Sequence, residues 1–153
     1  GDYQRQLFLV DHAGLPLATV LTPNLPEAAD LLALPEAVDR AGMLAQARAL
    51  LALGPKAVLL KGGHLAGDEC PDLFVDAAGS YWLTALRLAT RRTHGTGCTL
   101  SSALATLIAR TGDPLAAARA AKAYTLGAIS GAGALTVGHG HGPTDHFFAQ
   151  RTA

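Results

Sequence analysis

Short runs of apolar residues, separated by Pro, Gly and Asn, mark the strands that the sequence predicts. Residues 17–21 and 57–60 are compact apolar runs bounded by such residues, which is typical of strands buried in a parallel sheet. Residues 73–76 and 80–83 flank three residues that end in a glycine, and this spacing predicts an antiparallel hairpin. A further short strand is expected at 87–90.

Between and after these runs, apolar residues recur with the period of an α-helix. One apolar face repeats at i, i+3, i+4, i+7 and i+8 after a glycine-rich turn, and a glycine follows at the expected C-cap; these positions are Leu100, Ala103, Leu104, Leu107, Ile108 and Gly112. Further helices are predicted at 26–33, at 35–53 and from Asp113 to about residue 128. The alternation predicts a three-layer α/β/α sandwich with a mostly parallel sheet, and no composition shift divides residues 1–153.

The composition narrows the class of partner. Apolar residues make up 50% of the chain, charged residues make up 16%, and the net charge is zero. These values favour a globular protein with a small-molecule partner over one that binds nucleic acid or a membrane. Cys70 and Cys98 lack the spacing of a disulfide framework and no signal-like segment occurs, which indicates a reducing cytoplasm. Because the first residue is Gly1 and not Met, we also consider that the chain is a fragment.

The candidate chemistry centres on the turn at 95–98. This turn leads into a predicted helix, whose free backbone N–H groups and dipole form an anion site. Gly95 and Gly97 would let a phosphate approach the backbone without a Cβ in the way. Cys98 would lie at the edge of the site, a position that favours a thiolate able to accept a proton or attack an electrophile. The alternative is a cysteine that only packs after a glycine turn.

Polar residues that follow two predicted strands are candidate ligands. Asn24 and Glu27 carry the hard oxygen atoms that Mg²⁺ or its water shell accepts, although an Asn cap with Glu27 in the first helical turn is the alternative. Lys61 is a candidate phosphate-binding cation beside Gly62 and Gly63, which permit a close turn; a solvated lysine is the alternative.

Two further features carry weaker hypotheses. Lys122 is a lone positive charge in an Ala-rich helix and could reach a nucleotide. His139 and His141, with Asp145 and His146 nearby, suggest zinc, but no cysteine accompanies them and the surrounding glycines give little rigidity.

Four motifs, taken in order, resemble those of the hydroxymethylpyrimidine/phosphomethylpyrimidine kinases of thiamine biosynthesis, which belong to the ribokinase-like superfamily. They are TPNLPEA at 22–28, KGGH at 61–64, THGTGCTL at 93–100, and VGHG followed by GP within 137–143. The resemblance implies a ribokinase-like fold, of which residues 1–153 would be the C-terminal portion of a single kinase domain. It also implies that the first strands and most pyrimidine-binding residues belong to an N-terminal half that this chain lacks.

The resemblance implies an activity for the full-length parent: ATP-dependent phosphorylation of 4-amino-5-hydroxymethyl-2-methylpyrimidine and of its monophosphate. We expect that parent to be a cytoplasmic homo-oligomer that needs ATP and Mg²⁺. Cys98 stands where sugar kinases of the superfamily have an aspartate base, and it would deprotonate or position the substrate hydroxyl group. The other implied roles are Mg²⁺ and phosphate organisation through water by Asn24 and Glu27, an anion hole at Gly95, Thr96 and Gly97, and nucleotide contacts by Lys61, Thr96, Gly97 and Lys122.

Three alternatives stay open at this point. Pyridoxal kinases of the same superfamily also phosphorylate a hydroxymethyl group on a ring. Cys98 and His94 could instead form a nucleophile–base pair for acyl transfer, although no third orienting residue is evident. The chain could also be a catalytically inactive half-domain.

Overall fold

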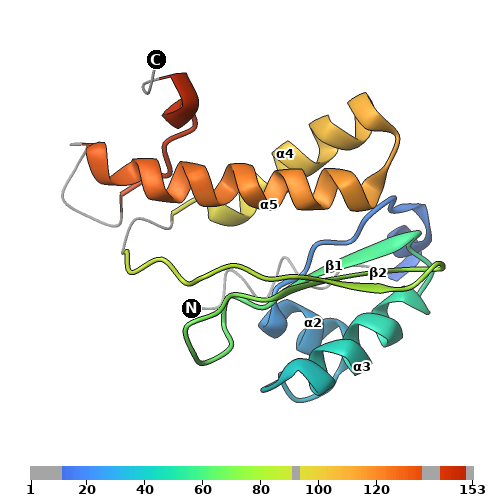
Figure 1. Ribbon diagram of the computed structural model, residues 1–153. Coiled ribbons are helices and arrows are strands. Elements are labelled where there is room, and N and C mark those ends of the chain that lie inside the picture. The colour runs from blue at the N-terminus through green and yellow to red at the C-terminus, as the bar shows by residue number, and fades with distance from the viewer. Residues whose placement is uncertain (1–11, 91–93, 136–141, 151–153) are drawn as a thin grey trace. The chain divides into compact units, whose positions relative to one another are not determined.

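The chain divides into two units, Gly1–Arg87 and Leu88–Ala153 (Figure 1). The computed structural model describes residues 12–90, 94–135 and 142–150. The first unit contains a small sheet and two α-helices, and the second contains two long α-helices and the segment that follows them.

The sheet of the first unit has three named strands, β1 (Ala57–Lys61), β2 (Asp72–Asp76) and β3 (Ser80–Leu83). They pair antiparallel in the order β1-β2-β3. The predicted hairpin is therefore confirmed, with one residue added at the start of its first strand. The named strands of the described chain contain no parallel pair, so a mostly parallel sheet is not what these residues form.

Within the first unit, the described parallel pairing involves the segment that precedes the first α-helix. Leu21 and Asn24 form isolated parallel bridges with Val58 and Lys61 of β1. The prediction of a buried strand at 17–21 is wrong in its bounds and burial, because Leu17 ends the 3₁₀ helix η1 (His12–Leu17) with 85% of its surface exposed. Pro16 lies inside this helix, and only the later residues of the run reach the edge of β1.

Helices α2 (Leu25–Leu32) and α3 (Arg40–Leu51) cover one face of this sheet (Figure 1). Their buried side chains meet those of β1 and β2 in one apolar core, which includes Leu25, Met43, Ala47, Leu50, Val58, Leu60, Leu73 and Val75. The predicted helix at 35–53 begins five residues late. Asp39 caps it by accepting a hydrogen bond from the Gly42 N–H (2.7 Å), while the Pro35 carbonyl accepts one from the Gln46 side chain (2.7 Å).

Arg87 fixes the loop that joins β1 to β2. Its guanidinium donates hydrogen bonds to four carbonyl oxygens of this loop, those of Gly63, Leu65, Gly67 and Glu69. The expected strand at 87–90 is absent from the described residues, where the nearest pairing is a bridge between Glu69 and Leu86. The Arg87 side chain thus uses its donors on the loop, and residues 87–90 form no ladder.

Replacing Arg87 by lysine should destabilise the first unit by about 1–2 kcal/mol, because an ammonium group cannot span four carbonyls that a planar guanidinium reaches at once. Chemical denaturation of the variant would measure the loss. Arg48→Lys is the matched control, since Arg48 is exposed and its guanidinium makes no hydrogen bond with the described residues. An equal effect of the two substitutions would contradict the proposed role of the guanidinium.

The second unit is built on α4 (Thr96–Thr111) and α5 (Pro114–Gly131), which pack side by side (Figure 1). The predicted caps are confirmed: Gly112 ends α4 with φ 69°, and Asp113 accepts a hydrogen bond from the Ala116 N–H (3.0 Å) at the start of α5. The short 3₁₀ helices η2 (Ala132–Ala134) and η3 (Phe148–Gln150) follow. No helix among the described residues combines the length and the apolar character needed to cross a membrane.

Phe148 anchors the last described segment to α5. Its side chain fills the space beside Gly127 and Gly131, where a Cβ at Gly131 would come within 2.6 Å of the Phe148 Cβ. The Phe148 ring also packs on Tyr124, with the ring centroids 5.6 Å apart. The Asp145 N–H donates to the Ala128 carbonyl (2.8 Å), so the segment is held to α5 at more than one point.

Candidate active site

The turn before α4 has the geometry of an open anion site. Gly95 is the N-cap residue, with φ 82° and ψ 3°, and it provides no side-chain cap. Side chains other than glycine rarely adopt this left-handed conformation, and the space where a Cβ would lie is empty, so conformation alone requires glycine here. Among the described residues, the N–H groups of Gly97 and Cys98 have no hydrogen-bond acceptor. They point along the helix axis, where the dipole favours an anion.

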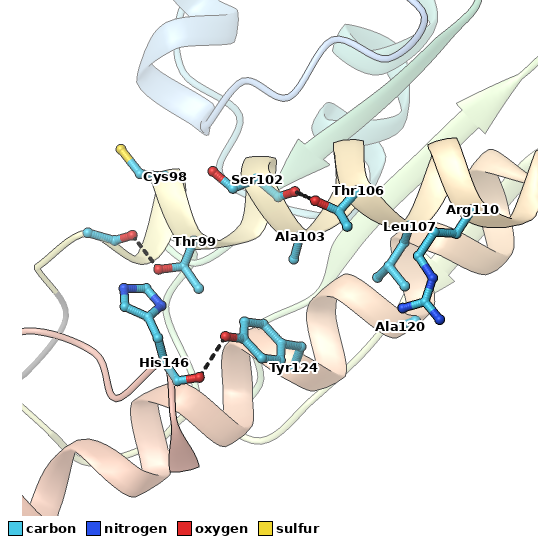
Figure 2. Close-up of a pocket in the computed structure, with 11 residues that line it drawn as sticks. Cys98, Thr99, Ser102, Ala103, Thr106, Leu107, Arg110, Ala120, Tyr124 and His146 are labelled. Carbon is cyan, nitrogen blue, oxygen red and sulfur yellow. Dashed lines mark hydrogen bonds between the residues drawn. The ribbon is translucent and has the colours of Figure 1, made fainter. Parts of the chain in front are cut away.

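Cys98 lies on the first turn of α4 as an exposed free thiol. It lines a cavity of about 650 Å³ that runs along α4 toward Arg110 (Figure 2). The packing alternative does not fit an exposed side chain. The cavity is lined by residues of the second unit, namely Gly95, Cys98, Thr99, Ser102, Ala103, Thr106, Leu107, Arg110, Ala120, Tyr124 and His146.

His94 and Cys98 do not form the pair that acyl transfer would need. His94 is exposed and forms an isolated bridge with Pro143, and no hydrogen bond joins it to Cys98 among the described residues. A nucleophile and its base are expected within hydrogen-bond reach. The geometry therefore gives the acyl-transfer alternative no support.

A pair of buried hydroxyl groups lies behind the turn. The Thr99 hydroxyl donates to the Gly95 carbonyl (2.9 Å), and it lies 3.2 Å from the Thr144 hydroxyl (Figure 2 draws the first contact). Thr99 is 5% exposed and Thr144 is 4% exposed. Sequence reasoning missed both, because a contact between residues 45 positions apart leaves no local pattern.

Asn24 and Glu27 form a capping box at the start of α2. The Glu27 N–H donates to the Asn24 side-chain oxygen (2.8 Å), and the Asn24 N–H donates to one Glu27 carboxylate oxygen (2.8 Å). The capping interpretation is thus confirmed, and it does not exclude a metal. The second carboxylate oxygen of Glu27 makes no hydrogen bond within the described part of the chain.

These donors fit Mg²⁺ held mostly by water. The described residues contain no group of three or more His, Cys, Asp or Glu side chains able to hold a metal. Mg²⁺ commonly keeps several waters and uses only one or two protein carboxylates together with substrate phosphates. One available carboxylate oxygen on Glu27 matches that pattern and not a cage made of protein alone.

The structure brings Lys61 next to Asn24. Lys61 ends β1, its N–H donates to the Pro23 carbonyl (2.9 Å), and it bridges Asn24 in parallel. Its ammonium group makes no hydrogen bond or ion pair with the described residues. Two candidates that lie 37 positions apart in the sequence therefore meet at one edge of the first unit.

Other candidates are placed differently. Lys122 is a buried residue of α5, 8% exposed, and it is not among the residues that line the cavity. Thr96 and Gly97 form the first turn of α4 and are half-buried. His139 and His141 lie outside the described residues.

Several cavity residues were not assigned to this site from the sequence. Ser102, Thr106 and Arg110 follow Cys98 at intervals of four residues, which places them on one helix face, and this spacing could have found them. Tyr124 and His146 come from other segments, and the Tyr124 hydroxyl donates to the His146 carbonyl (2.9 Å). Only the packed structure shows that these two residues border the same cavity.

Comparison of the structure with solved proteins defines its class. The pyridoxal kinase of Bacillus subtilis, solved as an ADP complex, matches with a TM-score of 0.87 and 31% identity over 97% of this chain and 57% of that one. The pyridoxal kinase of Staphylococcus aureus in complex with AMP-PCP matches with a TM-score of 0.83 and 34% identity over 90% and 50%. The fold is thus α/β and similar to that of ribokinase-like small-molecule kinases.

The sequence gives the family. Residues 5–145 match the phosphomethylpyrimidine kinase family model, and the chain belongs to that family. It is 48% identical over 135 residues to the hydroxymethylpyrimidine/phosphomethylpyrimidine kinase of Escherichia coli, a match that covers 88% of this chain and 51% of that protein. The chain spans about half the length of this relative and of the same kinases from Rhizobium meliloti and Salmonella typhimurium. The resemblance inferred from the four motifs is confirmed.

Proposed function

We propose that this chain contributes the phosphate-binding part of a kinase that transfers the γ-phosphoryl group of ATP to 4-amino-5-hydroxymethyl-2-methylpyrimidine and then to its monophosphate. One observation carries the proposal: Cys98 lies exposed at the mouth of an open helix N-terminus and lines a cavity, in a chain of the phosphomethylpyrimidine kinase family. A backbone site that can bind a phosphate and a side chain that can accept a proton are thereby adjacent.

In this proposal the turn and the thiol divide the work. The backbone N–H groups of Gly97 and Cys98, with the turn formed by Gly95 and Thr96, bind the oxygens of the transferred phosphoryl group as its charge develops. The Cys98 side chain orients the substrate hydroxyl and takes up its proton as the oxygen attacks phosphorus. The open cavity gives the acceptor ring room beside the thiol.

The first unit would serve the nucleotide. Lys61 supplies a cation for the phosphates, and the adjacent Asn24 and Glu27 would hold Mg²⁺ through water. The ion, when bound, supplies neutralisation of phosphate charge. A nucleotide contact by Lys122 would need that buried side chain to become accessible. The ADP and AMP-PCP complexes of the similar pyridoxal kinases support the use of ATP.

The proposal extends to the whole protein. Residues 1–153 would be the C-terminal portion of one ribokinase-like domain. The whole domain would be a three-layer sandwich with a mostly parallel sheet, to which the rest of the protein adds parallel strands. The parent would be a cytoplasmic homo-oligomer that acts on a small pyrimidine and binds neither nucleic acid nor membranes. The likeness to relatives about twice as long supports the first statement.

Pyridoxal phosphorylation is the second candidate. The structural similarity to two pyridoxal kinases, which covers 97% and 90% of this chain, favours it. The sequence identity of about one third to these kinases is lower than the 48% to the pyrimidine kinase of E. coli. The pyrimidine is therefore the favoured substrate.

A coupled assay of ADP release tests the choice of substrate. With the full-length protein, we expect turnover with 4-amino-5-hydroxymethyl-2-methylpyrimidine and little with pyridoxal, because the chain is more similar to the pyrimidine kinases. Omission of Mg²⁺ should abolish the signal, as charge on the phosphates would then be unneutralised. Turnover with pyridoxal alone would establish the second candidate, and turnover with neither would refute both.

A further inference from the structure

We propose that Thr144 is a positioning residue for the anion-binding turn, on which it acts through Thr99. The two hydroxyl oxygens lie 3.2 Å apart, and Thr99 contacts the carbonyl of Gly95, the N-cap of α4. The effect of Thr144 on catalysis rests on the proposed function, but its effect on the geometry of the turn can be measured without catalysis.

The direction of the hydrogen bonds follows from a count of protons. A carbonyl oxygen can only accept, so the single hydroxyl proton of Thr99 is used on Gly95. The contact between the two threonines must then have Thr144 as the donor. The result is a chain in which Thr144 donates to Thr99 and Thr99 donates to the Gly95 carbonyl. Such chains polarise each member and are strengthened in a buried environment.

The Gly95 carbonyl is the point at which this chain acts on the turn. It accepts a second hydrogen bond from the Thr99 N–H (2.8 Å), which is the first bond of α4. Gly95 has φ 82° and no side chain to restrain it, so these two bonds fix the peptide that precedes the open N–H groups. A shift of this peptide would change where those N–H groups point.

Thr144 is itself held from both sides. The preceding residue, Pro143, bridges His94 beside the turn, and the following residue, Asp145, donates its N–H to the Ala128 carbonyl of α5 (2.8 Å). Its hydroxyl is therefore presented from a fixed backbone, and the segment connects α5 to the N-terminus of α4. Nothing in the four sequence motifs assigns this role to residue 144.

Amide hydrogen exchange on the ¹⁵N-labelled chain tests the structural part. In Thr144→Val the exchange rate of the Thr99 N–H should rise by roughly 10-fold, because the bond to the Gly95 carbonyl opens more often. Thr144→Ser keeps the hydroxyl and should restore a rate near that of the unchanged chain. Thr125→Val is the matched control, since Thr125 is also buried and also donates to a carbonyl four residues earlier (2.8 Å) but lies within α5.

Kinetics of the full-length protein test the positioning role. We expect kcat to fall by roughly 10-fold in Thr144→Val, with little change in KM for the pyrimidine, because the turn serves the transferred group. Thr144→Ser should recover kcat, and Thr125→Val should leave it unchanged. If Thr144→Val does not fold, Thr99→Val interrupts the same chain of hydrogen bonds at its next member. Amide exchange at the start of α4 and kcat are then measured on that variant.

The outcomes separate this proposal from the proposed function. An unchanged exchange rate of the Thr99 N–H in Thr144→Val, or an equal rise of that rate in Thr125→Val, would overturn the positioning role even in an active kinase. Absence of ADP release from the unchanged protein would instead refute the proposed function, while the exchange data still decide whether Thr144 fixes the turn.

Discussion

Replacing Cys98 by alanine is expected to lower kcat by about 10² to 10⁴-fold, the usual worth of a positioned general acid or base. Cys98 borders the cavity, whereas the phosphate would be held by backbone N–H groups that the substitution leaves in place. Nucleotide affinity should therefore change little. The side chain is exposed, so the melting temperature should also be preserved.

The measurement is steady-state ADP release by the full-length protein, together with a nucleotide titration of the same variant. Cys70→Ala is the matched control, because Cys70 is the only other cysteine in the sequence and belongs to the first unit. The kcat of Cys98→Ser should fall between those of the unchanged protein and Cys98→Ala. A serine hydroxyl can orient the substrate, but it ionises less readily than a thiol and so accepts a proton less well. A kcat that survives in Cys98→Ala would remove the proposed chemical role.

Gly62→Ala should be severely destabilising, although the substitution adds one methyl group. A Cβ at this position would collide with the Pro71 carbonyl oxygen and would lie 3.0 Å from the end of the Met43 side chain. The Gly62 N–H also donates to the buried Asp72 carboxylate (3.0 Å), and this bond would be displaced as the backbone moves. We expect a loss of about 3 kcal/mol in the free energy of unfolding, at the upper end of what overpacking costs.

The neighbouring residue provides the control. Gly63 has no atom within 4 Å of the place where its Cβ would lie, so Gly63→Ala should change stability by only about 0.5 kcal/mol, as is usual for a surface position. Thermal and chemical unfolding of the two variants, measured side by side, would separate the effect of close packing from that of backbone flexibility. Equal losses would contradict the collision with Pro71.

These two glycines also show what sequence reasoning could and could not reach. The KGGH motif predicts a close turn that both glycines would serve. In the structure only Gly62 is constrained by its neighbours, because the chain folds back so that Pro71 passes beside it. The approach of a residue nine positions away has no trace in local periodicity or turn composition.

Local features were predicted more reliably than pairings. The caps at Asn24, Gly112 and Asp113 follow from short-range hydrogen bonds and backbone preference, and each is present. The apolar run at 17–21 predicts a buried strand, because composition cannot distinguish a central strand from a segment at a sheet edge. For the site, the Gly95 turn and the exposed thiol were foreseen, but the lining by Tyr124 and His146 depends on how α5 and the last segment pack.

The capping box at Asn24 and Glu27 limits how this part of the protein can diverge. Both residues begin α2 and both are candidate partners of Mg²⁺, so a change that alters one task also alters the other. Glutamine at position 27 is the exception, since it can complete a capping box but carries no charge. A lineage that lost the need for the metal could therefore keep its helix through a single Glu-to-Gln step, and such a chain would be folded and catalytically silent.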